Sequence, residues 1–126
     1  TTLDTAPLVA SVRRLAAAGT TLTSRMDRAL AAGPVPRATA DAVNRELIAF
    51  ERTWLHEPGI PGRAWFKHLL YAPRYTYAAM SLPGVTEAAE AGDWARAQAQ
   101  LALLVAKADA NAARVDRAVR LLDSAR

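Results

Sequence analysis

The sequence predicts an all-α fold: a four-helix-bundle-like domain with one long irregular loop that is rich in aromatic residues. In the first and last parts of the chain, apolar residues alternate at spacings of three and four, which places them on one face of a helix. Proline and glycine gather instead in the segment 57–84, where they interrupt any long regular element. A chain of 126 residues is long enough for one core, so we expect a single helical domain over residues 1–126.

The first two helices are predicted from their caps and stop signals. The first begins near Pro7, after the capping pair Asp4-Thr5, and stops at the turn 33–36, which reads Gly-Pro-Val-Pro. We expect a bend rather than a break near Gly19. Its predicted apolar face is Leu8, Val12, Leu15, Gly19, Leu22, Met26 and Ala29.

The second helix is predicted to begin after a Thr39 cap and to end near His56. Its predicted apolar face is Val43, Leu47, Phe50 and Trp54. A short helix follows the loop over Val85 to Ala91 and ends at Gly92.

The last helix is predicted from Trp94 to Ser124, with Asp93 as its cap. Its predicted apolar face is Ala97, Leu101, Leu104, Ala108, Ala112, Val115, Val119 and Leu122. Because alanine supplies little core volume, we expect larger side chains to provide most of the buried area. These side chains are Trp54, Trp65, Phe66, Leu69, Leu70, Tyr71 and Trp94. At least three of Trp54, Trp65, Phe66 and Tyr71 are expected in the core.

Composition argues against several classes of function. The net charge is +4, but the basic residues are scattered along the chain, usually singly beside acids, so we expect no nucleic-acid partner. No apolar stretch approaches the ~20 residues of a membrane span, and we expect no membrane partner. Without cysteine, and with two histidines that lack a ligand or catalytic partner at suitable spacing, the chain offers no metal site and no catalytic residue. We therefore predict that it is not itself an enzyme.

Five stretches together carry a resemblance to a known family. They are NRELIAFERTWL at 44–55, GIPGR at 59–63, WFKHLLYAP at 65–73, Tyr77, and SLPGV at 81–85. In order and spacing they resemble the transferrin receptor-like dimerisation domain, the C-terminal domain of the glutamate carboxypeptidase and transferrin receptor superfamily of zinc peptidases. The resemblance covers almost the whole chain.

The resemblance implies a homodimerisation domain that follows a zinc peptidase domain and packs against the peptidase domains of its own and the partner chain. Zinc is then expected in that peptidase domain, and this domain itself holds no cofactor. The absence of an initial methionine fits a domain cut from a longer chain, and the alanine- and arginine-rich composition suggests a bacterial source. The compartment stays open, although bacterial relatives suggest an exported or periplasmic protein.

The same resemblance suggests which residues meet substrate. Glutamate-specific members have a lysine-tyrosine pair before the proline-glycine, and it binds the substrate's terminal carboxylate. Tyr77 matches the tyrosine, whereas Thr76 stands at the lysine position, and Arg74 could supply the missing charge. We therefore expect a side-chain preference other than glutamate. Arg63 is expected to hold its turn through a carboxylate or carbonyls, and the ring of His68 to bond locally while its body packs.

Two readings of function remain at this point. The first is the dimerisation domain of a zinc peptidase, which lends a loop to the substrate pocket. The second is a free-standing helical adaptor or regulator that uses the same aromatic loop to hold an unrelated partner. A peptidase domain encoded directly upstream would decide for the first.

Overall fold

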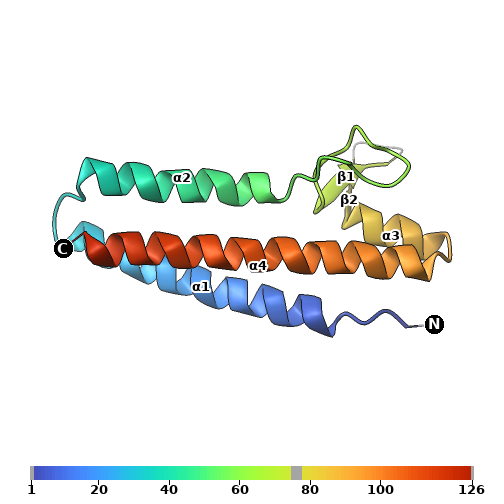
Figure 1. Cartoon of the computed structure of the whole chain (residues 1–126), viewed down its shortest axis with the longest axis horizontal. Coiled ribbons are helices and arrows are strands. Elements are labelled where there is room, and N and C mark those ends of the chain that lie inside the picture. The colour runs from blue at the N-terminus through green and yellow to red at the C-terminus, as the bar shows by residue number, and fades with distance from the viewer. Residues whose placement is uncertain (1, 75–77, 126) are drawn as a thin grey trace.

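The computed structural model describes residues 2–74 and 78–125, which form four helices and a two-stranded hairpin. The elements are α1 (Ala6–Ala31), α2 (Arg37–Thr53), β1 (Tyr71–Pro73), β2 (Ala79–Ser81), α3 (Pro83–Glu90) and α4 (Trp94–Ser124). Helices α1, α2 and α3 all pack against α4. Figure 1 shows α2 running antiparallel to α1 and α4, with α3 and the hairpin at the end where α4 begins. The all-α, four-helix-bundle-like class is confirmed.

The start of α1 is fixed by Asp4 rather than by Thr5. Asp4 Oδ1 accepts a hydrogen bond from the Ala6 amide at 3.1 Å, whereas the Thr5 side chain caps none of the described amides. The helix continues through Gly19 without a break, as expected. Downstream, the Thr23 hydroxyl donates to the Gly19 carbonyl at 3.1 Å, a local bond that the helix geometry accommodates.

The boundaries of α2 and α3 differ from those predicted. Helix α2 begins at Arg37 with Pro36 as its N-cap, so the predicted Thr39 cap is wrong. The fixed φ of proline, here −53°, already suits entry into a helix, and Thr39 falls inside the first turn. Helix α3 begins at Pro83, two residues before the predicted Val85, because proline is well tolerated in a first turn.

The segment predicted as irregular contains the hairpin. Strands β1 and β2 pair antiparallel, with Ala72 opposite Met80, and Ala72 is 1% exposed. Each strand has only three residues, so neither gives a recognisable alternation in the sequence. The hairpin fixes the two ends of the segment that contains residues 75–77, which lie outside the described residues.

Helix α4 has the predicted cap and nearly the predicted buried face. Asp93 Oδ1 accepts from the Arg96 amide at 3.0 Å, which confirms the cap. The buried residues are Ala97, Leu101, Leu104, Ala108, Asn111, Val115, Ala118 and Leu122. Ala112 and Val119, predicted on this face, are only partly buried. An α-helix has 3.6 residues per turn, so successive residues of its buried face are three or four positions apart. After Ala108 the spacing is three, which buries Asn111 rather than Ala112.

The expectation that at least three of Trp54, Trp65, Phe66 and Tyr71 lie in the core is wrong. Trp54 is buried, but Trp65 is 72% and Tyr71 53% exposed, and Phe66 is only partly buried. At one end of the bundle, the core where α1, α2 and α4 meet is aliphatic: Leu22, Val43, Val115, Ala118 and Leu122, with Leu15, Met26, Leu47 and Phe50 packed against them. Small residues on α4 let the helices approach closely, so little volume is left for large rings.

The early part of α1 buries a serine in place of the predicted valine. Ser11 is wholly buried, and Val12 is 48% exposed. Arg14 Nη2 donates to Ser11 Oγ at 3.0 Å and lies 2.5 Å from Asp109 Oδ1 on α4. Hydrogen bonds from Ser11, first, and Arg14 hold the pKa of Asp109 below its ordinary value. Near Ser11, α1 and α4 are therefore joined by a polar contact, where the sequence predicted an apolar one.

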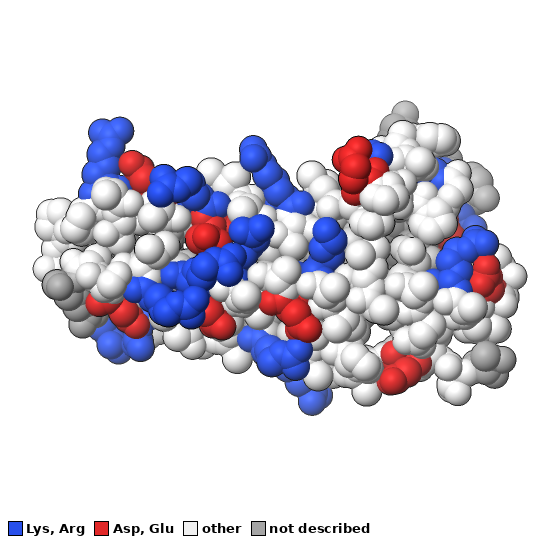
Figure 2. Space-filling view, viewed as in Figure 1, with Lys and Arg blue, Asp and Glu red and all other residues white. Residues whose placement is uncertain are grey.

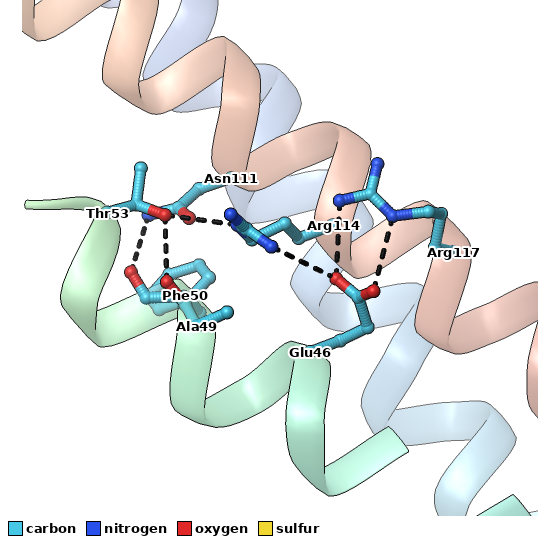
Figure 3. Close-up of polar contacts among 7 residues, drawn as sticks. All are labelled: Glu46, Ala49, Phe50, Thr53, Asn111, Arg114 and Arg117. Atoms are coloured by element: carbon cyan, nitrogen blue, oxygen red, sulfur yellow. Dashed lines mark hydrogen bonds and ion pairs between the residues drawn. The ribbon is translucent and has the colours of Figure 1, made fainter. Parts of the chain in front are cut away.

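Polar contacts also fix α2 on α4 (Figure 3). The buried Asn111 donates through Nδ2 to the carbonyl of Phe50 at 3.1 Å. Phe50 lies in the last turn of α2, where carbonyls have no partner within the helix, so this cross-helix bond pairs one of them and ties α2 to α4 in one register.

One turn further along α4, two arginines meet a single carboxylate. Arg114 Nη1 lies 3.4 Å and Arg117 Nη2 3.2 Å from Glu46 Oε2, and Arg114 Nε donates to Thr53 Oγ1 at 3.1 Å (Figure 3). The hydrogen bond from Arg117 is the largest of the causes that lower the pKa of Glu46 from its ordinary 4.5. The carboxylate is therefore stabilised in its charged form.

Glu46→Gln should destabilise the domain by about 1 kcal/mol at pH 7, because the Glu46 side chain is 22% exposed and loses charge-assisted bonds. A lowered pKa contributes stability above the unfolded-state pKa, and this contribution is lost as the pH falls through the folded-state pKa. In urea unfolding from pH 7 to 3, the gap between wild type and variant should therefore close below pH 4.5. Asp41→Asn, which breaks only an exposed 3.7 Å pair with Arg37, serves as the control and should change little.

Candidate functional site

The candidate site is the segment 54–82, which leaves α2 at Trp54 and returns through the hairpin to α3. The segment folds back on itself through backbone hydrogen bonds: His56 N donates to Lys67 O at 2.8 Å, and Leu69 N donates to Trp54 O at 3.0 Å. Within this fold, Ile60 N donates to Phe66 O at 2.9 Å. Ile60 is 1% exposed, so its side chain is buried within the domain.

Two glycines shape the tip of this loop. Gly59 has φ +76° and Gly62 has φ +82°, both in the region that favours glycine. A Cβ on Gly59 would lie 2.1 Å from the Ala64 carbonyl oxygen, whereas a Cβ on Gly62 would meet no atom of the described chain within 4 Å. Gly59 is therefore required for close backbone approach as well as for its φ.

Arg63 connects three parts of the site. Its Nη1 donates to the Pro73 carbonyl at the end of β1, and its Nη2 donates to Glu87 Oε1 on α3 at 2.6 Å. Its guanidinium also lies 4.8 Å from the centroid of the Phe66 ring. The side chains of Arg63 and Glu87 are 19% and 21% exposed, so solvent screens this pair less than a surface pair. These contacts support the predicted loop-structuring role.

His68 bonds locally on both ring nitrogens. Its Nδ1 accepts from the Leu70 amide at 3.2 Å, which leaves Nε2 to donate to Glu51 Oε1 at 3.3 Å. The ring stacks on Tyr71 with 4.1 Å between centroids. Through Glu51 and Tyr71, His68 joins the end of α2 to β1. These contacts agree with the locally bonded, packed histidine that the sequence suggested.

Arg74 lies at the edge of the described hairpin. Its Nη1 is 2.5 Å from Glu90 Oε2 on α3, and it helps to line a shallow hollow. The residues around this hollow are Pro61, Gly62, Arg63, Arg74, Glu87 and Arg96. A carboxylate ligand at Arg74 would have to compete with Glu90 for the same guanidinium. Tyr77 lies outside the described residues, and its substrate-binding role remains a prediction.

The described residues do not bring metal ligands together. Over residues 2–74 and 78–125, no group of three His, Asp or Glu side chains could hold a metal ion. Within the same ranges, no helix has the length and apolar character that a membrane crossing requires. On the face in Figure 2, basic and acidic side chains are interspersed along the bundle, without the single-sign region that a phosphate backbone favours.

The feature that the domain does offer is exposed apolar surface. The large exposed side chains include Val9, Val12, Leu30, Ile48, Leu55, Trp65, Tyr71 and Trp94. Where such side chains form a large contiguous patch, they mark contact with another protein surface, whereas scattered ones are normal. Several of these residues, among them Val12, Trp65 and Tyr71, are expected in the core from the sequence but are exposed, and the sequence pattern does not single out Leu30 or Ile48. Ile48 lies off the predicted α2 face of Val43, Leu47 and Phe50, and this was the available signal that it points outward.

A comparison with known protein families shows what kind of domain this is. Residues 3–116 match the model of the transferrin receptor-like dimerisation domain. This chain belongs to that family. The resemblance that the five sequence stretches suggested is confirmed, and the domain is one found in glutamate carboxypeptidases.

Three relatives of known description align with part of this dimerisation domain. An inactive zinc metalloprotease of Schizosaccharomyces pombe is 37% identical over 62 residues, which is 48% of this chain. Probable glutamate carboxypeptidases of Zea mays and Arthroderma benhamiae are each 42% identical, over 36% and 38% of this chain. The aligned segments span only 8%, 7% and 7% of the respective relatives.

Gly59→Ala should destabilise the domain by about 2 kcal/mol or more. The new Cβ would collide with the backbone of Ala64, and the alanine would have to adopt a positive φ. Gly62→Ala is the matched control, with the same sign of φ but open space, and should cost about 1 kcal/mol. Thermal unfolding of both variants measures the difference. Equal losses would show that the close approach to Ala64 contributes nothing.

Proposed function

We propose that this chain is the non-catalytic homodimerisation domain of a zinc-dependent glutamate carboxypeptidase-like exopeptidase. The match over residues 3–116 to a dimerisation-domain family carries the proposal. Exposed apolar side chains on an otherwise well-packed helical bundle support it, since such surface is stabilised by covering it with protein.

In this proposal, the segment 54–82 faces the peptidase domain. Trp65, 72% exposed beside the partly buried Phe66, offers an aromatic contact that a neighbouring domain could cover. Arg63 fixes β1 against α3, and the chain enters residues 75–77 directly after β1 and Arg74. The loop would then present Tyr77 to the substrate pocket, with Arg74 as a second contact. Zinc and the catalytic groups would belong to the peptidase domain.

The description of one relative as an inactive metalloprotease suggests a parent protein that assembles without catalysis. The second candidate is a free-standing helical adaptor or regulatory protein-interaction domain. The two candidates differ in the expected partner: a second copy and a peptidase domain for the first, an unrelated protein for the second.

Equilibrium sedimentation of the isolated chain should reveal reversible self-association. We expect a dissociation constant below about 1 mM, the scale of about −4 kcal/mol, because part of the natural interface would come from the peptidase domain. A single monomeric species at all concentrations up to that value would count against homodimerisation by this domain and favour the adaptor.

In a full-length enzyme that carries this domain, Tyr77→Phe should weaken kcat/KM by about 1 to 2 kcal/mol, the scale of one hydrogen bond to a charged group. Thermal stability should stay unchanged, because a group that meets substrate is not packed into its own core. Tyr71→Phe makes the same chemical change at a ring that stacks on His68, and its kinetics should equal those of wild type. Lost stability with unaltered kinetics for Tyr77→Phe would identify a packing residue instead.

A further inference from the structure

The last turn of α3 carries two carboxylates, Glu87 and Glu90. At this end of a helix a carboxylate meets the negative end of the helix dipole, so neither side chain stabilises the helix itself. Both instead meet arginines of the segment that precedes α3. Glu87 Oε1 lies 2.6 Å from Arg63 Nη2, and Glu90 Oε2 lies 2.5 Å from Arg74 Nη1. The end of α3 therefore holds the chain where it leaves β1 and enters residues 75–77.

The two ion pairs differ in their exposure to solvent. The side chains of Arg63 and Glu87 are 19% and 21% exposed, and Arg63 also donates to the Pro73 carbonyl, so this pair is part of the packed structure. The side chains of Arg74 and Glu90 are 32% and 49% exposed. An ion pair of that exposure contributes little stability, and its arginine can exchange one carboxylate for another.

Charges are balanced around the hollow that Arg74 helps to line. Three of the lining residues are arginines, Arg63, Arg74 and Arg96. Each is paired with a carboxylate, and Arg96 Nη2 lies 2.8 Å from Asp93 Oδ2. A carboxylate that entered the hollow would bind Arg74 only by displacing Glu90, and it would then lie close to a like charge. A neutral amide of the same shape meets no such repulsion.

We propose that Glu90 is a specificity-determining residue, which by pairing with Arg74 disfavours substrates that bring a side-chain carboxylate to this loop. The inference rests on the proposed function, in which Arg74 contacts substrate, and it names the substrate class: peptides whose C-terminal residue has a neutral side chain. A charge placed against the wrong ligand is a common source of specificity. Thr76 is uncharged, so it offers an incoming carboxylate no ion pair in place of Arg74.

The test compares two substrates in a full-length enzyme that carries this domain: a peptide that ends in glutamate and the same peptide ending in glutamine. The two side chains have nearly the same shape and differ in charge, so the ratio of their kcat/KM values isolates the effect of the carboxylate. Wild type should favour the glutamine peptide. Glu90→Gln should raise the glutamate-to-glutamine ratio by about fivefold, the effect of removing one like charge about 4 Å away in water. Since Glu90 is half-exposed, Tm should stay close to that of wild type.

Asp123→Asn is the matched control. Asp123 Oδ1 lies 2.9 Å from Arg25 Nε, and these side chains are 45% and 31% exposed, much like Glu90 and Arg74. The substitution changes the net charge equally, but it lies at the opposite end of α4 from α3 (Figure 1), so the ratio should stay within about twofold of wild type. Adding Arg74→Gln to Glu90→Gln should also return the ratio to within about twofold of wild type, because the arginine that attracts the carboxylate is then removed as well.

A ratio that Glu90→Gln leaves unchanged would overturn the role of Glu90, and so would a wild-type enzyme that prefers the glutamate peptide. If Tyr77→Phe still weakens kcat/KM in that case, the proposed function stands without this inference. If Arg74→Gln and Tyr77→Phe both leave the kinetics of both peptides unchanged, the loop does not reach the substrate, and the proposed pocket role itself fails.

Discussion

The structure depends on the buried face of α4. Ala97, Ala108 and Ala118 have no exposed surface and alternate with larger residues such as Leu101 and Leu104. Alanine at these points lets neighbouring backbones come close, and the leucines fill the space between them. Because α1, α2 and α3 all pack on this one helix, a larger side chain at any of the three alanines would push a whole element outward.

This common helix also determines where the functional surfaces lie. Asn111 and Arg114 fix the register of α2, and α2 ends where the loop begins at Trp54. At the other end of the loop, Arg63 joins β1 to α3, which itself packs on α4. The aromatic loop is thus held at both ends by elements that share one support. A surface that is ordered before binding loses less conformational entropy when a partner covers it.

The sequence predicted the helices well and the core less well, for physical reasons. Long periodic stretches specify helices, and the Asp93 cap and the proline turns specify their ends. Burial was harder to predict because the spacing of apolar residues does not distinguish a helix face that packs on α4 from a face that contacts a partner. Trp65 and Val12 are apolar, yet they point outward in an isolated domain. Asn111 was missed because a single polar residue between apolar ones gives no periodic signal.

We propose that this domain folds as one unit and then associates with a second copy. Thermal unfolding followed at increasing protein concentration tests it most directly, since association stabilises the native state by mass action. We expect one cooperative transition even in dilute solution, with a Tm that rises by several degrees once the protein concentration exceeds the dissociation constant. A Tm that is the same at every protein concentration would contradict association with a second copy, and an unfolded chain in dilute solution would contradict independent folding.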